Sequence, residues 1–188
     1  MMMMDRRIGR LPAGIPVIAL LLVGALAVFW VINDSAIEYL EETNRWVAHT
    51  VEVKATITRV QSSRSRVETR ERGVVLQPSE AAVAEYRAAR GDIIGHVEEL
   101  EKLVADNPRP TELLDRLRPE LEDELRFFDE VVALRLDSGF DAARNAVGSR
   151  LLRGGGGAVE NLLEQMEIEE TRLLGERVAR QRAAWIQT

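Results

Sequence analysis

The chain has 188 residues with 25 basic and 31 acidic side chains, a length that suits one ordinary domain. The total charge is −6, and the first 32 residues contribute +2 (three Arg against one Asp), so the remaining residues carry −8. Such an acidic main part repels a phosphate backbone and argues against a nucleic-acid partner. The absence of cysteine excludes disulfides, thiolate metal sites and thiol nucleophiles, and two histidines leave little for a metal centre.

An uncharged, apolar segment of 22 residues runs from Leu11 to Ile32. As a helix it would be about 33 Å long, which matches the hydrocarbon core of a bilayer. Three arginines precede it and several carboxylates follow it, so the positive-inside rule places the N-terminus in the cytoplasm. A cleaved signal peptide is the alternative, but its apolar core is shorter and a small-residue cleavage site would follow. The sequence predicts a cytoplasmic tail (1–10), a transmembrane helix (11–32) and an extracytoplasmic, periplasmic or extracellular domain (33–188).

The first helix outside the membrane is predicted from about Ser35 to Val74, where glycine and proline are absent until Gly73. A seam of residues recurs along it in steps of three and four, as in a heptad repeat. Its members are Thr50, Val53, Ile57, Val60, Arg64, Val67, Glu71 and Val74. Pro78 then ends the helix, and Ser79 is a good N-cap for the next one.

Two further helices show the same spacing. The second is marked by Val83, Tyr86, Arg90, Ile93, Val97, Leu100 and Val104, and the third by Leu114, Leu117, Leu121, Leu125, Phe128 and Val132. The segment 105–110 between them is predicted to be a turn, because Pro108 and Pro110 disfavour a helical conformation at the residue before each. The pair Ser138-Gly139 is predicted to end the third helix.

A short helical piece from Phe140 to about Val147 and a glycine run (154–157) precede the last helix. Its apolar stripe is formed by Val159, Leu162, Leu163, Met166, Leu173, Leu174 and Val178. No strand pattern is present, and long helices joined by short loops lie antiparallel to their neighbours. The fold class predicted from these patterns is all-α, an up-down-up-down four-helix bundle whose first helix continues from the transmembrane helix.

With an even number of antiparallel helices, the last helix returns to the membrane surface at Trp185–Thr188. We therefore expect a second transmembrane helix to follow Thr188. A domain held between two such spans is placed to sense a stimulus and to transmit it inward.

Charged residues on or beside the predicted seams need an account, because a charge inside a bundle costs several kcal/mol unless it is paired. The candidates for a polar layer or a ligand pocket are Arg64, Glu68, Glu71, Arg72, Arg90 and Glu170. One interpretation is an anion or small-molecule pocket lined by Arg64 and Arg90. The favoured one is an internal layer of salt bridges, in which Arg64 or Arg72 pairs with Glu68, Glu71 or Glu170 and fixes the helix register.

Catalytic motifs are absent from the sequence. His96 lacks the flanking residues of a phospho-accepting histidine, and His49 is likewise read as an ordinary helix residue. The glycine run has no following Lys, so it is not a phosphate-binding loop. We predict no enzyme activity, no catalytic residues, no cofactor and no metal for this chain.

Several segments together resemble one family, the CHASE domain of type three. They are RWVAHT at 45–50, ETRERGVVL at 68–76, LVADNP at 103–108, ALRLDSGFDAA at 133–143 and MEIEETRLL at 166–174. Arg70 and Glu71 stand where Gly-Gln is more usual, and the glycine run departs from the expected glycine with a basic residue. The resemblance covers about residues 40–178. It implies a four-helix extracytoplasmic sensory domain of bacterial histidine kinases, cyclases and related receptors, with no general ligand.

Two functions follow as hypotheses. The first is a signal-sensing input module of a membrane receptor, most specifically a two-component sensor histidine kinase, that acts as a homodimer and responds to an unknown small-molecule or protein stimulus. The second is a membrane-tethered helical adaptor without signalling output. A second membrane span and a cytoplasmic output domain after Thr188 would distinguish the receptor from the adaptor.

Overall fold

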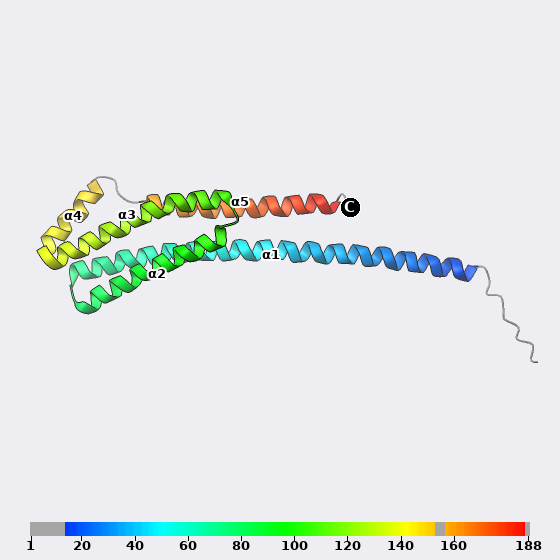
Figure 1. The fold of residues 1–188 in the computed structure, drawn as a ribbon, viewed down its shortest axis with the longest axis horizontal. Helices are drawn as coiled ribbons and strands as arrows, with labels where there is room; N and C mark the ends of the chain where they lie inside the picture. Colours follow the sequence, from blue (N-terminus) through cyan, green and yellow to red (C-terminus); the bar gives the residue numbers. More distant parts are fainter. Residues whose placement is uncertain (1–13, 153–156, 187–188) are drawn as a thin grey trace, which may run out of the picture. The chain divides into compact units, whose positions relative to one another are not determined.

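The computed structural model describes residues 14–152 and 157–186, and these residues form helices joined by short turns (Figure 1). The helices are α1 (Gly14–Leu76), α2 (Glu80–Val104), α3 (Pro108–Ser138), α4 (Phe140–Leu152) and α5 (Ala158–Ile186). No strand occurs in this described part of the chain. The predicted all-α class is therefore confirmed.

The chain divides into two compact units, the first ending at Arg45 and the second beginning at Trp46. Within the described residues, no helix contains a stretch that is both long and apolar enough to cross a membrane. Residues 11–13 of the predicted span lie outside the described residues. The span remains a prediction from the sequence.

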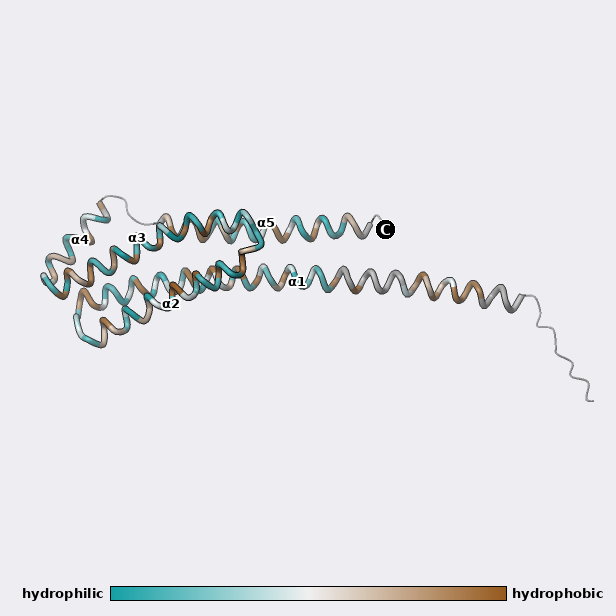
Figure 2. The backbone as a smooth tube through the Cα atoms, viewed as in Figure 1, coloured by the Kyte–Doolittle hydropathy of each residue, from teal (hydrophilic) through white to brown (hydrophobic). Residues whose placement is uncertain are grey.

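One hydrophobic core runs through the second unit, and α1, α2, α3 and α5 all contribute to it. The seam predicted on α1 is buried, because Val53, Ile57 and Val67 have no exposed surface. The predicted stripes of the other helices supply further core residues, among them Ile93, Leu100, Leu117, Leu125, Leu163 and Met166. Each buried side chain of this size contributes about 1.5–3 kcal/mol. Figure 2 shows hydrophobic residues recurring between hydrophilic ones along these helices.

Ion pairs between α1 and α2 show that the two helices are antiparallel. Arg59 Nη1 lies 2.7 Å from Glu99 Oε2, and Arg70 Nη1 lies 2.5 Å from Glu85 Oε2. Residue numbers thus rise along α1 while they fall along α2.

The remaining neighbours alternate in the same way. Arg118 of α3 pairs with Glu101 of α2, and further along, Asp129 of α3 pairs with Arg90 of α2. Between α1 and α5, Lys54 lies 3.2 Å from Glu167, while Trp46 lies under the guanidinium of Arg177. Both helix pairs are therefore antiparallel, and for α2 and α3 this agrees with the short connection between them.

The turn between α1 and α2 follows the sequence prediction. The helix α1 ends at Leu76, two residues before Pro78, and Ser79 Oγ accepts a hydrogen bond from the backbone N–H of Ala82 at 3.1 Å. Ser79 is thus the N-cap of α2, which satisfies one of the free N–H groups of its first turn.

The turn before α3 is shorter than predicted. Asn107 is extended (φ −115°, ψ 110°), as expected before a proline, but the helix starts at Pro108 and already includes Arg109. The predicted non-helical Arg109 is therefore wrong. Pro108 and Pro110 lie in the first helical turn, where their missing N–H groups have no partner within the helix to lose.

Gly139 ends α3 with φ +91°, a conformation that disfavours any other residue, and the predicted end at Ser138 is confirmed. The following helix, α4, is longer than predicted and continues through Gly148 to Leu152. It packs against α3 (Figure 1), and such packing offsets the cost of about 1 kcal/mol for a glycine within a helix. Residues 154–156 of the glycine run lie outside the described residues.

Candidate functional site

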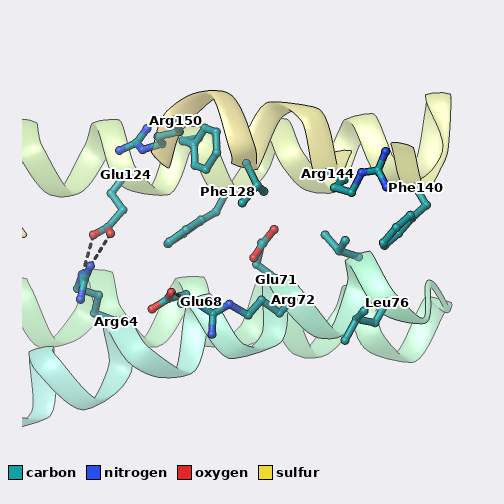
Figure 3. Close-up of a pocket in the computed structure, with 13 residues that line it drawn as sticks. Arg64, Glu68, Glu71, Arg72, Leu76, Glu124, Phe128, Phe140, Arg144 and Arg150 are labelled. Carbon is teal, nitrogen blue, oxygen red and sulfur yellow. Dashed lines mark hydrogen bonds and ion pairs between the residues drawn. The ribbon is translucent and has the colours of Figure 1, made fainter. Parts of the chain in front are cut away.

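A cavity of about 510 Å³ lies between the C-terminal part of α1, the middle of α3 and α4 (Figure 3). Its size is within the range of ordinary ligand pockets. Four of the residues that the sequence singled out line it, namely Arg64, Glu68, Glu71 and Arg72. We call it the α1–α3–α4 cavity.

An ion pair between α1 and α3 lies at one end of the cavity (Figure 3). Arg64 Nη2 lies 2.7 Å from Glu124 Oε1, and Arg64 Nε donates to Glu124 Oε2 at 2.8 Å. The Arg64 side chain is 17% exposed and that of Glu124 is 11% exposed. The two parallel hydrogen bonds from a planar guanidinium fix this geometry, and the hydrogen bond to Glu124 raises the pKa of Arg64.

Glu71 stands deeper in the cavity and is almost completely buried, with 4% of its surface exposed. Its Oε1 atom has no hydrogen-bond partner among the described residues, and Figure 3 shows its carboxylate directed into the space between α1 and α3. Burial raises the pKa of Glu71 to about 7, because the charged carboxylate is poorly solvated there.

The other arginines of the cavity already have contacts. Arg72 pairs with Glu68 one turn away on α1, but the Arg72 side chain is 68% exposed, so this pair is not the internal layer that the salt-bridge interpretation described. On α4, Arg144 lies 3.1 Å from Asp141, and the guanidinium of Arg150 lies 4.4 Å from the ring centre of Phe127.

Arg90 is not part of this cavity. It pairs with Asp129 at 2.9 Å, beside the hydroxyl of Tyr86, which donates to the same carboxylate at 2.7 Å. Burial, together with the Asp129 contact, raises the pKa of Tyr86. Arg90 lines a separate groove between α2 and α3, so the structure does not bring Arg64 and Arg90 to one pocket.

Glu170 lies in a different polar cluster, near the part of α1 where the second unit begins. It is fully buried, and burial raises its pKa, against the opposing influence of His49 and Arg177. Arg177 donates to Asn107 Oδ1 at 3.1 Å. Besides Glu71 Oε1, the buried polar atoms without a hydrogen-bond partner among the described residues are His49 Nε2, Thr50 Oγ1, Asn107 Nδ2, Arg177 Nη1 and both carboxylate oxygens of Glu170.

Several residues of the cavity were missed at the level of sequence. Glu124 directly precedes Leu125 of the predicted stripe and follows Leu121 by three positions. The signal that could have identified Glu124 is a charged side chain at the edge of an apolar stripe, as with Arg64 in the α1 seam. Nothing in the periodicity indicated that Arg144, Arg150 and Phe140 would lie across from α1, because α4 is a separate short helix.

The described residues show neither a metal site nor a catalytic arrangement. No group of three His, Asp or Glu residues among them is placed to hold a metal ion. His96 Nδ1 lies 2.8 Å from Ser63 Oγ, between α1 and α2, which is a structural contact. What the cavity offers to a ligand is therefore a set of charged side chains, one carboxylate oxygen without a partner among the described residues, and aromatic rings.

Comparison with known proteins agrees with this arrangement. The family model of the CHASE3 domain matches residues 43–180. The crystal structure of the sensor domain of the histidine kinase HK9 from Rhodopseudomonas palustris is similar, with a TM-score of 0.57 and 26% identity over 66% of this chain and 98% of that one. Among curated protein sequences, no match was found.

The family match spans most of the chain and includes the helices that line the cavity. CHASE3 domains are extracytoplasmic sensory domains without catalytic activity, which agrees with the absence of catalytic motifs in the sequence. By this match, the chain belongs to the CHASE3 domain family.

Proposed function

We propose that this chain is the extracytoplasmic signal-sensing input module of a bacterial membrane receptor, most specifically a two-component sensor histidine kinase. The observation that carries the proposal is the CHASE3 match over residues 43–180, together with the likeness to a histidine kinase sensor domain. The α1–α3–α4 cavity is the proposed stimulus site, since it is lined by both charged and aromatic side chains.

The proposed receptor is anchored by residues 11–32, with its N-terminus in the cytoplasm and residues 33–188 outside. Within this segment, the described apolar side chains between residues 20 and 30 are exposed; Leu20 is 73% and Trp30 68% exposed. Exposed apolar side chains on a helix suit a lipid environment. The antiparallel order of the ion pairs supports an up-down-up-down four-helix bundle for the extracytoplasmic part.

Signal transmission is proposed to use α1 and α5, acting within a homodimer. These helices lie side by side, because Lys54 contacts both Glu167 (3.2 Å) and Thr171 (3.4 Å) of α5. A stimulus would shift one helix along the other by about 1–2 Å, the scale of known helix shifts at interfaces.

The test locks α5 in two different positions along α1. The sensor domain of HK9 is replaced by residues 46–178 of this chain in a cysteine-free kinase, and thiols are introduced as Lys54→Cys with Glu167→Cys or with Thr171→Cys. The two α5 positions are one turn, about 6 Å, apart. Bridging each pair with a reducible bifunctional reagent should give two different rates of autophosphorylation in membranes, and reduction should abolish the difference.

The matched control is Arg118→Cys with Glu101→Cys, which bridges α2 and α3 and involves no residue of α1 or α5. Its bridging should leave autophosphorylation unchanged. Equal kinase activity in the two α1–α5 bridged forms would refute transmission through these helices and favour the tethered adaptor.

A further inference from the structure

We propose that the α1–α3–α4 cavity binds an organic cation whose protonated amine donates to Glu71 while its apolar body lies against Phe128 and Phe140. The inference rests on the proposed sensory function, because it names the class of stimulus for the same site. Glu71 is the starting point, since it is nearly completely buried and its Oε1 atom has no partner among the described residues. A buried acceptor left without a partner costs about 1–3 kcal/mol, which a donating ligand would recover.

Three of the four arginines that line the cavity are paired with carboxylates other than Glu71, and the fourth, Arg150, lies over the ring of Phe127. Arg64 is held by two hydrogen bonds to Glu124, and Arg72 pairs with Glu68. Arg144 pairs with Asp141 on its own helix. At these three arginines an anionic ligand would have to compete with a carboxylate, whereas at Glu71 a cation meets a carboxylate oxygen that has no partner among the described residues.

The walls of the cavity suit the rest of such a ligand. Phe128 and Phe140 line it from α3 and α4, and Val75 and Val147 add aliphatic surface. Phe140 is 43% exposed, so its ring is accessible to a ligand. Aromatic faces attract cations as well as apolar groups, by about 0.5–2 kcal/mol per contact. The lining carries four arginines and three glutamates, and Arg64, Arg72 and Arg144 are each paired with a carboxylate.

Because Glu71 can bind a proton, the affinity of the cavity for an organic cation depends on pH. Burial holds its pKa at about 7, so acidic solution protonates the carboxyl group and weakens its attraction for an ammonium group. The titratable and charged groups that line the cavity or influence Glu71 come from every helix around it: Arg64, Glu68 and Arg72 of α1, Tyr86 of α2, Glu124 of α3, and Arg144 and Arg150 of α4.

The test uses three probes with the same phenyl body: 2-phenylethylamine (cation), 2-phenylethanol (neutral) and 3-phenylpropionate (anion). Each is titrated calorimetrically into the full 188-residue chain in lipid nanodiscs, with empty nanodiscs as the blank. The amine should bind about tenfold or more tightly than the other two, because only it donates a charged hydrogen bond to Glu71. Its affinity should rise about tenfold from pH 6 to pH 8, over which the amine stays protonated.

Two variants decide whether Glu71 is responsible. Glu71→Gln should remove the preference for the amine and its pH dependence, while Glu164→Gln, at an exposed position of α5, should keep both. Preference for 3-phenylpropionate, equal binding of the three probes, absence of binding, or an unchanged preference in the Glu71→Gln variant would overturn the proposal. The cross-linking experiment on α1 and α5 uses no ligand, so the sensory function can be supported even if this titration fails.

Discussion

At the scale of single residues, the pair of Arg64 and Glu124 is the contact whose loss we expect to matter most. Replacing Arg64 by Ala leaves the Glu124 carboxylate, 11% exposed, without its partner. The expected loss is about 3–5 kcal/mol in the free energy of unfolding, because an unpaired charge then remains buried. Urea denaturation measures it.

Two comparisons test that explanation. Arg59→Ala removes an exposed partner of Glu99 and should cost less than about 1 kcal/mol. Arg64→Met combined with Glu124→Leu removes both charges and should restore most of the stability lost in Arg64→Ala. A double variant as unstable as Arg64→Ala would show that packing, and not the unpaired charge, causes the loss.

Glu71 gives a second prediction at this scale. Its pKa is raised from 4.5 to about 7 in the folded protein, so folding favours its protonated form and the protein loses stability as the pH rises through 7. Glu71→Gln should therefore raise the free energy of unfolding at pH 8 by up to about 3 kcal/mol and change it little at pH 4.5. Denaturation at the two pH values measures this, and an equal effect at both would contradict the burial argument.

At the scale of the helix, the glycines of α2 lower its stability without an evident packing role. Gly91 and Gly95 are exposed in the middle of α2, and a Cβ atom added at either would meet nothing within 4 Å. Gly91→Ala and Gly95→Ala should each raise the free energy of unfolding by about 1 kcal/mol.

Gly139 is the matched control for these substitutions. It also has open space around it, but its φ of +91° strains any L-residue. Gly139→Ala should therefore lower the melting temperature while the α2 variants raise it. An increase in all three variants would indicate that Gly139 relaxes to an ordinary conformation in solution.

The sequence predicts which side chains of a helix are buried where core residues recur at a regular spacing. Thr50, Val53 and Ile57 were placed on a seam by spacing alone, and the structure buries all three. The start of α3 was not readable in this way. Proline breaks a helix only where the backbone N–H that it lacks would form a hydrogen bond within the helix. Pro110 falls in the first turn of α3, where no such N–H is needed.

At the scale of the whole molecule, two buried carboxylates lie at different ends of one core. Glu71 lines the α1–α3–α4 cavity, whereas Glu170 is influenced by His49, which is about 33 Å away from Glu71 along α1. Both have raised pKa values, so the melting temperature should fall between pH 5 and pH 8.

The two contributions should be additive, since groups this far apart rarely interact. Glu71→Gln and Glu170→Gln should each reduce the pH dependence of the melting temperature, and the double variant should reduce it by the sum. A double variant that equals one of the single variants would show that the two ends of the bundle are coupled.

The sequence by itself determined which segments are helical, most of the residues that they bury, and the family; Leu173, Leu174 and Val178 of the predicted α5 stripe are only half-buried. Each of these depends on local spacing or on segments in a fixed order, which one chain displays without its fold. Only the tertiary structure decided the partners: Arg64 with Glu124, Arg90 with Asp129, and Glu71 with no partner for its Oε1. Which side chains pair between two helices depends on the register and the rotation of one helix relative to the other, and a fraction of a turn changes the partners. The periodicity of a single helix contains no information about either.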